Sequence, residues 1–435
     1  MTSPENGRML RLEEALERVL SGARPLPVED AVPEDAAGQV LAAPVVAGTS
    51  LPPWDNTAMD GFAVRSADVA RASEAAPVEL RVIGEVAAGH VPARAVEPGT
   101  ALRITTGAMI PAGADAVVPV EDTDAPAGVS ALPDSVRVRV PVQPGANLRR
   151  AGEDVRLGDT VLQAGRVLGP AAVALAAACG VAHVAVYRRP RVGILATGDE
   201  LTPAGHPLGS GRIHDSNTPA LLVQSRAAGA VATSFGIASD DPFTLAGMLA
   251  EAVARSDVVV LSGGVSVGAH DHVKDAFETL GEVAFWRVAI QPGKPLAFGW
   301  TTAGRGGDAA DPDRPVALFG LPGNPVSAFV TFELFVRPLL RALGGRGEET
   351  DRRRVRATLA EPVTKSSGRR AFLRVRLERD PAWPDRYLAR PVKGQGSHML
   401  SGLAAADGLA VVPEDVPGLP AGSEVEVWEL EDEGS

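Results

Sequence analysis

The spacing of apolar residues predicts different kinds of structure in successive parts of the chain. Over residues 8–20, apolar side chains recur at helical spacing, which predicts an amphipathic helix that ends at Ser21 and Gly22. From residue 51 to residue 149 the apolar runs are short and are separated by turns rich in glycine and proline. Such runs are typical of strands, so residues 51–149 are predicted to form a small β domain.

Helix and strand patterns return over residues 150–187. We expect this stretch to join residues 1–50 in one N-terminal domain of helix and strand, which makes the β domain an insertion. The longest apolar stretch, residues 167–186, is interrupted by Gly169, Pro170 and Gly180. It therefore predicts a short buried helix that ends near Gly180 and then a strand, and not a membrane span.

The stretch from residue 188 to residue 343 alternates between strand and helix patterns. Strands are predicted at 191–196, 231–237, 257–261, 283–289, 296–300 and 316–321, and helices at 218–228, 242–255, 271–280 and 324–343. The strands are almost wholly apolar, which is typical of a mostly parallel sheet covered by helices on both faces. Such a three-layer α/β domain binds ligands beyond the carboxyl ends of its strands.

The last part of the chain again shows short apolar runs of the kind that form strands. Residues 344–354 are rich in glycine and charge and are predicted to be a linker. Short runs separated by turn residues then predict an all-β, barrel-like domain over residues 351–435. The predicted fold class is therefore multidomain, with a central α/β domain, an inserted small β domain and a C-terminal β domain.

Charge and composition exclude several classes of protein. The 435 residues carry a net charge of −12 and no extended basic patch, which speaks against binding of nucleic acid or of an anionic membrane. The single cysteine, Cys179, rules out an intrachain disulfide framework and fits a reducing compartment. The N-terminal residues lack the pattern of a signal peptide, so a cytoplasmic protein is expected. Four of the 42 basic residues are lysines, namely Lys274, Lys294, Lys365 and Lys393.

Glycine and serine follow three strands of the predicted α/β domain. These segments are residues 197–200 (TGDE), 262–271 (SGGVSVGAHD) and 320–327 (GLPGNPVS). Backbone N–H groups between a buried strand and a helix start can close on a phosphate, helped by the helix dipole. A single segment of this kind often only turns the chain. Three that open on the same edge of one sheet predict a binding site for a phosphorylated ligand.

Acidic residues gather at the same predicted edge. Glu200, Asp215, Asp240 and Asp271 all lie just past strands or at helix starts. Capping of the helix N-terminus explains Asp240, Asp241 or Asp271 equally well when each is taken alone. Carboxylates beside a phosphate repel it unless a divalent cation lies between them, and hard oxygen ligands favour Mg²⁺. The pattern therefore predicts a phosphorylated ligand bound together with Mg²⁺.

Three further segments mix charged residues with turn formers. Residues 52–63 (PPWDNTAMDGFA) contain two acids, an amide and two aromatic residues, a mixture that core packing does not need and that suggests an active-site loop. Residues 147–154 (NLRRAGED) pair arginines with acids, and on local grounds alone a solvated surface turn is favoured for them. In residues 291–295 (QPGKP), the proline after Lys294 keeps this lysine extended, which suits either a point charge for an anion or a plain loop lysine.

Ten segments in order resemble one known family. PPWDNTAMDGFAV, LRITTGAMIPAGADAVV, NLRRAGED, ILATGDEL, GRIHDSN, SDDP, LSGGVSVGAHDHVK, FWRVAIQPGKPLAFG, GLPGNPVSAFVTF and QGSHML are similar to the molybdopterin molybdenumtransferase family, which includes the bacterial MoeA proteins and the plant and gephyrin E domains. The resemblance runs from about residue 10 to residue 428. Ten motifs in register over nearly the whole chain make it highly specific.

The resemblance implies the last step of molybdenum cofactor synthesis. Adenylylated molybdopterin loses AMP in a reaction that depends on Mg²⁺ and molybdate, and molybdate is inserted at the dithiolene. An elongated homodimer of four-domain subunits is also implied, in which residues 1–50 and 150–187 form the dimerisation domain and the α/β domain of one subunit faces the β domain of the other. Expected partners are the molybdopterin adenylyltransferase and downstream assembly factors for molybdoenzymes, but no nucleic acid and no membrane.

Site residues follow motif by motif from the same resemblance. It implies catalytic roles for Asp60, Asp154, Glu200, Asp240, Asp271 and Lys294, with Glu200, Asp240 and Asp271 as metal ligands. Substrate binding is expected of Arg149, Thr197, Gly198, Asp215, Asn217, Ser262, Gly263, Gly264, Pro322 and Pro325. The chain departs from the family pattern where Gln291 replaces a second lysine of some members and where Phe62 and His214 replace tyrosines.

Two other functions are compatible with parts of the pattern. One is a scaffold that kept the fold and lost catalysis, and the retention of the acids named above argues against it. The other is a different Mg²⁺-dependent nucleotide or phosphate-ester enzyme built on the α/β domain. The flanking β domains and the DNTAMDG loop argue against this second alternative.

Overall fold

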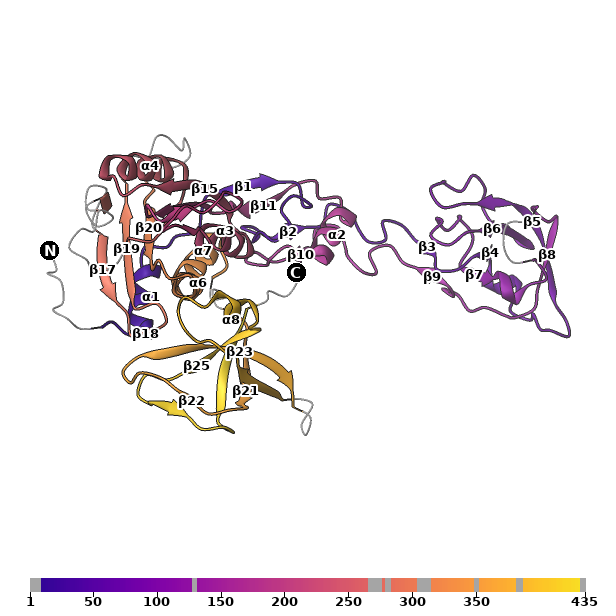
Figure 1. Cartoon of the computed structure of the whole chain (residues 1–435). Helices are drawn as coiled ribbons and strands as arrows, with labels where there is room; N and C mark the ends of the chain where they lie inside the picture. Colours follow the sequence, from indigo (N-terminus) through magenta and orange to yellow (C-terminus); the bar gives the residue numbers. More distant parts are fainter. Residues whose placement is uncertain are drawn as a thin grey trace. The chain divides into compact units, whose positions relative to one another are not determined.

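Contacts within the computed structural model divide the chain into two units. The structure describes residues 9–126, 131–264, 276–277, 283–302, 314–347, 352–380 and 386–430. Unit 1 comprises residues 1–30, 38–42 and 185–435, and unit 2 comprises residues 31–37 and 43–184 (Figure 1). Asp271 and Lys274, together with most of the predicted helix 271–280, lie outside the described residues.

The centre of unit 1 is a six-stranded sheet. Its strands follow the order β15 (Val231–Ala238), β12 (Arg191–Thr197), β16 (Val258–Ser262), β20 (Val316–Leu321), β19 (Pro295–Thr301) and β17 (Val283–Arg287). The first four strands are parallel, whereas β19 runs antiparallel to both of its neighbours. The prediction of a mostly parallel sheet is confirmed, with an antiparallel strand near one edge.

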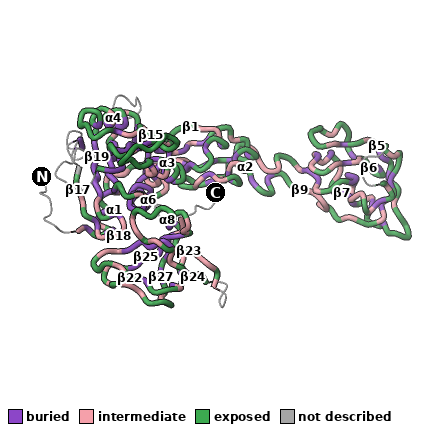
Figure 2. The backbone as a smooth tube through the Cα atoms, viewed as in Figure 1, coloured by how far each residue is buried: buried purple, intermediate pink, exposed green. Residues whose placement is uncertain are grey.

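Helices cover both faces of this sheet. One face packs against α3 (Asn217–Ala227), α6 (Pro325–Thr331), a π-helical turn (Phe332–Val336) and α7 (Arg337–Leu343), and the other packs against α4 (Pro242–Arg255). Along β16, Val258 and Val260 point to the first face, and Val259 and Leu261 point to the second. Neighbouring residues of a strand point to opposite faces, so a strand buried on both sides is apolar throughout. Strand β16 is buried at every residue, whereas the edge strand β15 is exposed or intermediate except at its last residue (Figure 2).

Helix α1 (Leu12–Leu20) packs in unit 1, against α7 and the π-helical turn. Its residues Leu12, Ala15 and Val19 are buried in the same core as α3 and α7. The sequence pattern instead grouped residues 1–50 with residues 150–187. The difference arises because apolar spacing predicts that a helix has a buried face but does not identify the surface that covers it.

A closed β-barrel forms the C-terminal part of unit 1. Its strands β23 (Arg370–Arg379), β24 (Tyr387–Pro391), β21 (Arg354–Leu359), β27 (Glu424–Glu429) and β25 (Gly408–Val412) pair in this order, and β25 pairs again with β23. The barrel-like prediction is thereby confirmed. Short strands β22 (Val363–Thr364) and β26 (Gly418–Leu419) and helix α8 (Leu400–Ala404) complete it. One further strand, β18 (Ile290–Gln291), reaches from the α/β domain and pairs in parallel with β23.

Unit 2 contains a five-stranded sheet in the order β7 (Ala116–Pro119), β4 (Gly61–Val64), β6 (Thr100–Ile104), β5 (Val78–Val86) and β8 (Ser135–Val138). Alternate residues of β4 enter the two separate cores on its faces, since Phe62 and Val64 lie in one and Ala63 lies in the other. The short strands β3 (Asn56–Thr57) and β9 (Leu148–Arg149) pair with each other in this unit, as do β2 (Val45–Val46) and β10 (Thr160–Leu162).

The long apolar stretch near residue 170 forms the predicted helix and strand. Helix α2 (Pro170–Ala178) ends before Gly180, which has a φ of 74°, and β11 (Val184–Tyr187) follows and pairs with β1 (Val28–Ala31). Among the described residues, every helix is too short or too polar to cross a membrane.

Candidate functional site

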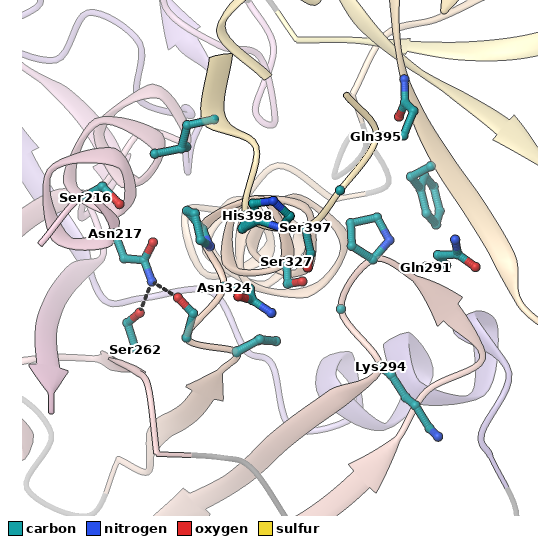
Figure 3. A pocket seen from close by; sticks show the side chains of 18 of the residues that line it. Ser216, Asn217, Ser262, Gln291, Lys294, Asn324, Ser327, Gln395, Ser397 and His398 are labelled. Atoms are coloured by element: carbon teal, nitrogen blue, oxygen red, sulfur yellow. Dashed lines mark hydrogen bonds between the residues drawn. The ribbon is translucent and has the colours of Figure 1, made fainter. Parts of the chain in front are cut away.

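A pocket of about 1210 Å³ opens in unit 1 between the α/β domain and the C-terminal barrel. Thr197, Ser262 and Pro322 line it at or just past the carboxyl ends of β12, β16 and β20. Figure 3 shows Asn217 and Ser262 on one side of the pocket and Gln291 and Lys294 on the other. The predicted site residues that line it are Thr197, Glu200, Asp215, Asn217, Ser262, Gly263, Lys294, Pro322 and Pro325. This is the sheet edge at which α/β proteins bind ligands.

Asn217 connects three of the loops that form the pocket. From the start of α3, its Nδ2 donates one hydrogen bond to Ser262 Oγ at 2.7 Å and a second to the carbonyl oxygen of Gly323 at 2.9 Å (Figure 3). Both hydrogens of the amide nitrogen are therefore used within the protein. The Ser262 hydroxyl accepts from Asn217 and keeps its own hydrogen, which can be donated to an oxyanion in the pocket.

The glycine turn after β16 differs in one respect from its predicted role. The N–H of Gly263 donates to the carbonyl oxygen of Leu321 at 3.2 Å, so it is occupied by the neighbouring strand. Gly263 has a φ of 100°, and a Cβ atom there would lie 2.6 Å from the carbonyl oxygen of Thr197. This position requires glycine because β12 approaches so closely. Gly264 is exposed and has a φ of 66°, and it is not among the residues that line the pocket.

The structure shows which of the acids before α3 and α4 accept hydrogen bonds from the first N–H groups of these helices. Asp241 caps α4, since its carboxylate accepts from the N–H of Thr244 at 2.8 Å. Asp240 therefore does not cap this helix, and its Oδ2 lies 3.5 Å from the N–H of Asp199. Asp215, which is buried, accepts through Oδ1 from the N–H groups of Asn217 and Thr218 at 3.1 and 3.0 Å and so caps α3.

Glu200 presents an exposed carboxylate to the pocket from the loop after β12. A Cβ atom on Gly198, which has a φ of 141°, would overlap this carboxylate. Gly198 itself lines a neighbouring pocket of about 680 Å³. Within the described residues there is no group of three acidic, histidine or cysteine side chains placed to hold a metal ion.

The opposite wall of the pocket carries basic side chains. Lys294 extends from the loop that follows β18, and Arg369 and His398 come from the barrel. Gly293, next to Lys294, has a φ of 101°, and a Cβ atom there would overlap the hydroxyl of Thr331 in α6. The loop of Lys294 is thus pressed against α6 on one side and paired through β18 with the barrel on the other.

Sequence reasoning missed the pocket residues that the barrel supplies. These are Thr364, Arg369, Phe372, Gln395, Ser397 and His398, among others. Residues 395–398 belong to the QGSHML motif, and this motif was the sequence signal that could have identified them as pocket residues. Arg374, only 1% exposed, holds this segment by donating from Nη1 to the carbonyl oxygens of Gly396 at 3.1 Å and Met399 at 3.2 Å. Burial lowers the pKa of the Arg374 guanidinium.

Three predicted site residues, Asp60, Arg149 and Asp154, lie in unit 2. Asp60 precedes β4 and accepts through Oδ1 from the N–H of Thr106 at 2.6 Å and from its hydroxyl at 2.8 Å. The backbone bond and then the hydroxyl bond of Thr106 lower the pKa of Asp60, because both favour the charged carboxylate. Asp154 is exposed, and its N–H donates to the carbonyl oxygen of Leu51 at 3.0 Å.

The paired arginines at residues 149 and 150 have different surroundings. Arg150 donates from Nη1 to Asp55 Oδ2 at 2.6 Å, and the N–H of Ala151 donates to Asp55 Oδ1 at 2.8 Å. The backbone bond from Ala151 and then the bond from Arg150 lower the pKa of Asp55. Arg149 pairs through its backbone with Asn56, and its side chain is exposed. Of the two arginines, Arg149 is the one whose guanidinium is not engaged with Asp55.

Known protein families match almost the whole chain in three regions. Residues 10–180 match the MoeA N-terminal region (domain I and II), residues 193–342 match a probable molybdopterin binding domain, and residues 356–430 match the MoeA C-terminal region (domain IV). The pocket is lined by residues from the second and third of these regions.

Similar proteins are found among curated sequences and solved structures. The chain is 41% identical to molybdopterin molybdenumtransferase 2 of Mycobacterium tuberculosis over 91% of its own length and 93% of that protein. It is 36% identical to molybdopterin molybdenumtransferase of a Nostoc species over 91% of the chain and 87% of that protein. The crystal structure of a molybdopterin biosynthesis MoeA protein from Pyrococcus horikosii aligns with a TM-score of 0.77 and 36% identity, and the alignment covers 98% of this chain and 100% of that one.

Proposed function

Because the chain belongs to the MoeA family of molybdopterin molybdenumtransferases, we propose that the pocket between its α/β domain and its barrel binds the phosphorylated substrate into which molybdenum is inserted. The substrate in this proposal is adenylylated molybdopterin, supplied by a molybdopterin adenylyltransferase. The products are AMP and the molybdenum cofactor, which downstream assembly factors receive.

One observation carries this proposal, namely that acidic and basic side chains line opposite walls of the pocket. Glu200 and Asp215 belong to the wall from the α/β domain, whereas Lys294 and Arg369 belong to the wall from the β18 loop and the barrel. A pyrophosphate and a molybdate dianion repel one another in one site. Fixed cations placed beforehand reduce this repulsion at no cost of reorganisation during the reaction.

The acids that remain available fit a hard divalent cation. The carboxylate of Glu200 lines the pocket. The carboxylate of Asp240 does not cap α4, because Asp241 does so, and its Oδ2 lies 3.5 Å from the N–H of Asp199. Carboxylate oxygens of this kind are the ligands that Mg²⁺ prefers. Glu200 and Asp240, with Asp271 from outside the described residues, would hold the ion. Bound Mg²⁺ would neutralise charge that develops on the pyrophosphate oxygens.

The remaining residues have roles that follow from their contacts. Ser262 donates its hydroxyl hydrogen to a phosphate oxygen, and Asn217 fixes its orientation. Lys294 and Arg369, which line the pocket, supply positive charge for the molybdate oxyanion. Hydrolysis of the phosphate linkage breaks one bond from phosphorus to the bridging oxygen and forms one bond from phosphorus to the oxygen of water. AMP carries the bridging oxygen if water attacks the molybdopterin phosphorus, and molybdopterin phosphate carries it if water attacks the adenylyl phosphorus. The protons of the water pass to the two phosphate products or to solvent.

We also propose that the protein acts as a homodimer. Asp60, Arg149 and Asp154 belong to unit 2, whereas the pocket belongs to unit 1, and the family resemblance implies that different subunits supply them. The test is to mix an Asp60→Ala variant with a Lys294→Ala variant, each inactive alone. Restored activity in the mixture supports a shared site, and continued inactivity contradicts it.

Release of AMP from adenylylated molybdopterin tests the reaction itself. We expect release by the purified chain only when Mg²⁺ and molybdate are both present. Equal turnover without molybdate would instead indicate a different phosphate-ester enzyme. A folded, dimeric protein with no turnover would indicate a scaffold.

A further inference from the structure

A buried carboxylate lies in the helix that follows β20, eight residues beyond the predicted site residue Pro325. Glu333 belongs to the π-helical turn Phe332–Val336, and its side chain is 1% exposed. A π-helical turn inserts an extra residue into a helix and is frequently found at functional positions. Glu333 therefore has a buried charge and an irregular backbone that the site described above does not use.

The carboxylate of Glu333 is surrounded by donors from different elements. Its Oε1 accepts from Nε2 of Gln224 in α3 at 2.6 Å, and its Oε2 accepts from Nε of Arg352 at 2.6 Å. Arg337 Nε lies 3.9 Å from the same Oε2. Arg352 also donates from Nη1 to the carbonyl oxygen of Leu430 at 2.7 Å. We call Glu333, Gln224, Arg352 and Leu430 the Glu333 network.

The Glu333 network connects the two walls of the pocket at a point away from the pocket itself. Both α3 and the helix that begins with α6 start at the pocket, with Asn217 and Pro325 among its lining residues. Gln224 follows Asn217 by about two helical turns, or roughly 10 Å along the axis. Arg352 and Leu430 lie at the two ends of the described barrel chain, just before β21 and just after β27. One carboxylate thus holds both pocket helices and both ends of the barrel.

Other contacts also join the α/β domain and the barrel. Phe372, Leu409 and Trp428 of the barrel lie in one core with the helices of the α/β domain, and Arg370 donates from Nη1 to Glu13 Oε1 in α1 at 2.6 Å. The N–H of Val326 donates to the carbonyl oxygen of Ser397 at 3.0 Å, and β18 pairs with β23. The Glu333 network adds a buried ion pair to these contacts, and its geometry is fixed because misalignment leaves a charge buried without its partner.

We propose that Glu333 is a positioning residue that sets the orientation of the barrel against the α/β domain and thereby the separation of the two pocket walls. The proposal rests on the proposed function in that substrate must bind between these walls. Glu333 touches no substrate in this account. It acts through Arg352 on the barrel and through Gln224 on α3.

The first test is steady-state kinetics of the full-length Glu333→Gln variant with adenylylated molybdopterin. We expect KM to rise about tenfold while kcat stays within about twofold, because the walls are misplaced and the reacting groups are unchanged. Glu424→Gln is the matched control, since Glu424 pairs with Arg356 on the exposed surface of the same barrel. An unchanged KM in Glu333→Gln, or an equal rise in the control, would overturn the proposal.

A double variant separates positioning from stability. Glu333→Gln with Arg352→Met removes the charges of Glu333 and Arg352, whereas the buried charge of Arg337 remains, so the melting temperature that falls in the single variant should recover in part. Under the proposal KM stays high in the double variant, because the connection to Leu430 is still missing. If KM returns to the wild-type value together with the melting temperature, Glu333 serves stability alone.

Distance measurements test the proposal without turnover. Spin labels at Ala250→Cys in α4 and Ala421→Cys in the barrel, both exposed positions, report the barrel orientation in a chain whose buried Cys179 is replaced by serine. Arg352→Lys keeps the charge but loses the planar group that reaches Glu333 and Leu430 together. We expect a broader distance distribution in this variant, and an unchanged one would contradict the proposal. Because no substrate is needed, this result stands even if the proposed reaction fails.

Discussion

Asn217 and Ser262 lie at the ends of different elements of the α/β domain, yet their side chains are joined by a hydrogen bond of 2.7 Å. The same nitrogen of Asn217 also donates to the carbonyl oxygen of Gly323 at 2.9 Å. The amide therefore aligns three loops that follow β14 (Ile213–His214), β16 and β20. Its contribution to the site lies in this alignment, and the group left to contact a ligand is the hydroxyl of Ser262.

Replacement of Asn217 by aspartate should lower kcat/KM for AMP release by about 10- to 100-fold. The carboxylate accepts but cannot donate, so Ser262 and the Gly323 carbonyl both lose their donor, at about 1–3 kcal/mol. Asn324→Asp adds the same charge to the same pocket without breaking this bridge. A comparable loss in Asn324→Asp would attribute the effect to charge and not to alignment.

The basic wall predicts how the enzyme responds to molybdate concentration. Lys294→Gln should raise the KM for molybdate, because one of the positive charges that face the pocket is lost. Gln291→Lys should lower it, since Gln291 lines the same wall and the new ammonium adds a charge. Lys393→Gln serves as the control, because Lys393 is exposed but is not among the lining residues. A molybdate KM that does not change in Lys294→Gln would place oxyanion binding elsewhere.

Gly263 and Gly205 allow a steric effect to be separated from a backbone effect. Both have positive φ, at 100° and 86°, but a Cβ atom on Gly263 meets the Thr197 carbonyl at 2.6 Å, whereas one on Gly205 meets no atom within 4 Å. Gly205→Ala should cost about 1 kcal/mol of stability from the backbone conformation alone. Gly263→Ala should cost more and should also abolish most of the activity, because β12 and β16 must move apart at the pocket. Equal melting temperatures and equal activities in the two variants would contradict this account.

The Asp60 carboxylate should titrate at lower pH than an ordinary aspartate. The bonds from Thr106 lower its pKa in the folded protein, so their contribution to stability is present above the unfolded-state pKa and is lost as pH falls through the folded-state pKa. Thr106→Ala removes the hydroxyl bond and keeps the backbone bond, which is the larger cause. We therefore expect the midpoint to rise only partway in the variant, measured by NMR of the side-chain carboxyl carbon. A midpoint in the variant equal to that of the intact protein would show that the hydroxyl bond has no effect.

The parts of the fold that could be predicted were those that the local sequence pattern determines. Strands such as β16 are buried on both faces and are therefore continuous apolar runs, and helix α4 follows a capping aspartate at its predicted start. The pattern could not decide whether Asp240 or Asp241 is the cap, because both precede the helix. The structure decides it through the bond from Thr244 to Asp241.

The parts that could not be predicted depend on which surfaces meet. Arg369 and His398 lie on a barrel that sequence patterning identified as a separate domain, and nothing local shows that this barrel covers the sheet edge. The packing of helix α1 against α7 likewise depends on which surfaces meet. The Gly263 N–H was expected to bind phosphate, but it is taken by Leu321 of the adjacent strand, a partner that depends on strand order and not on the motif.

Strand β18 restricts which parts of the chain can be exchanged between members of the family by recombination. The barrel begins after the linker, yet one of its pairing partners, residues Ile290 and Gln291, comes from a segment much earlier in the chain. A recombination event at the linker would carry the barrel away from the strand that covers the edge of β23, and it would also leave Lys294 with a foreign neighbour. Exchange of specificity between relatives should therefore require residues 290–295 and the barrel to be inherited together.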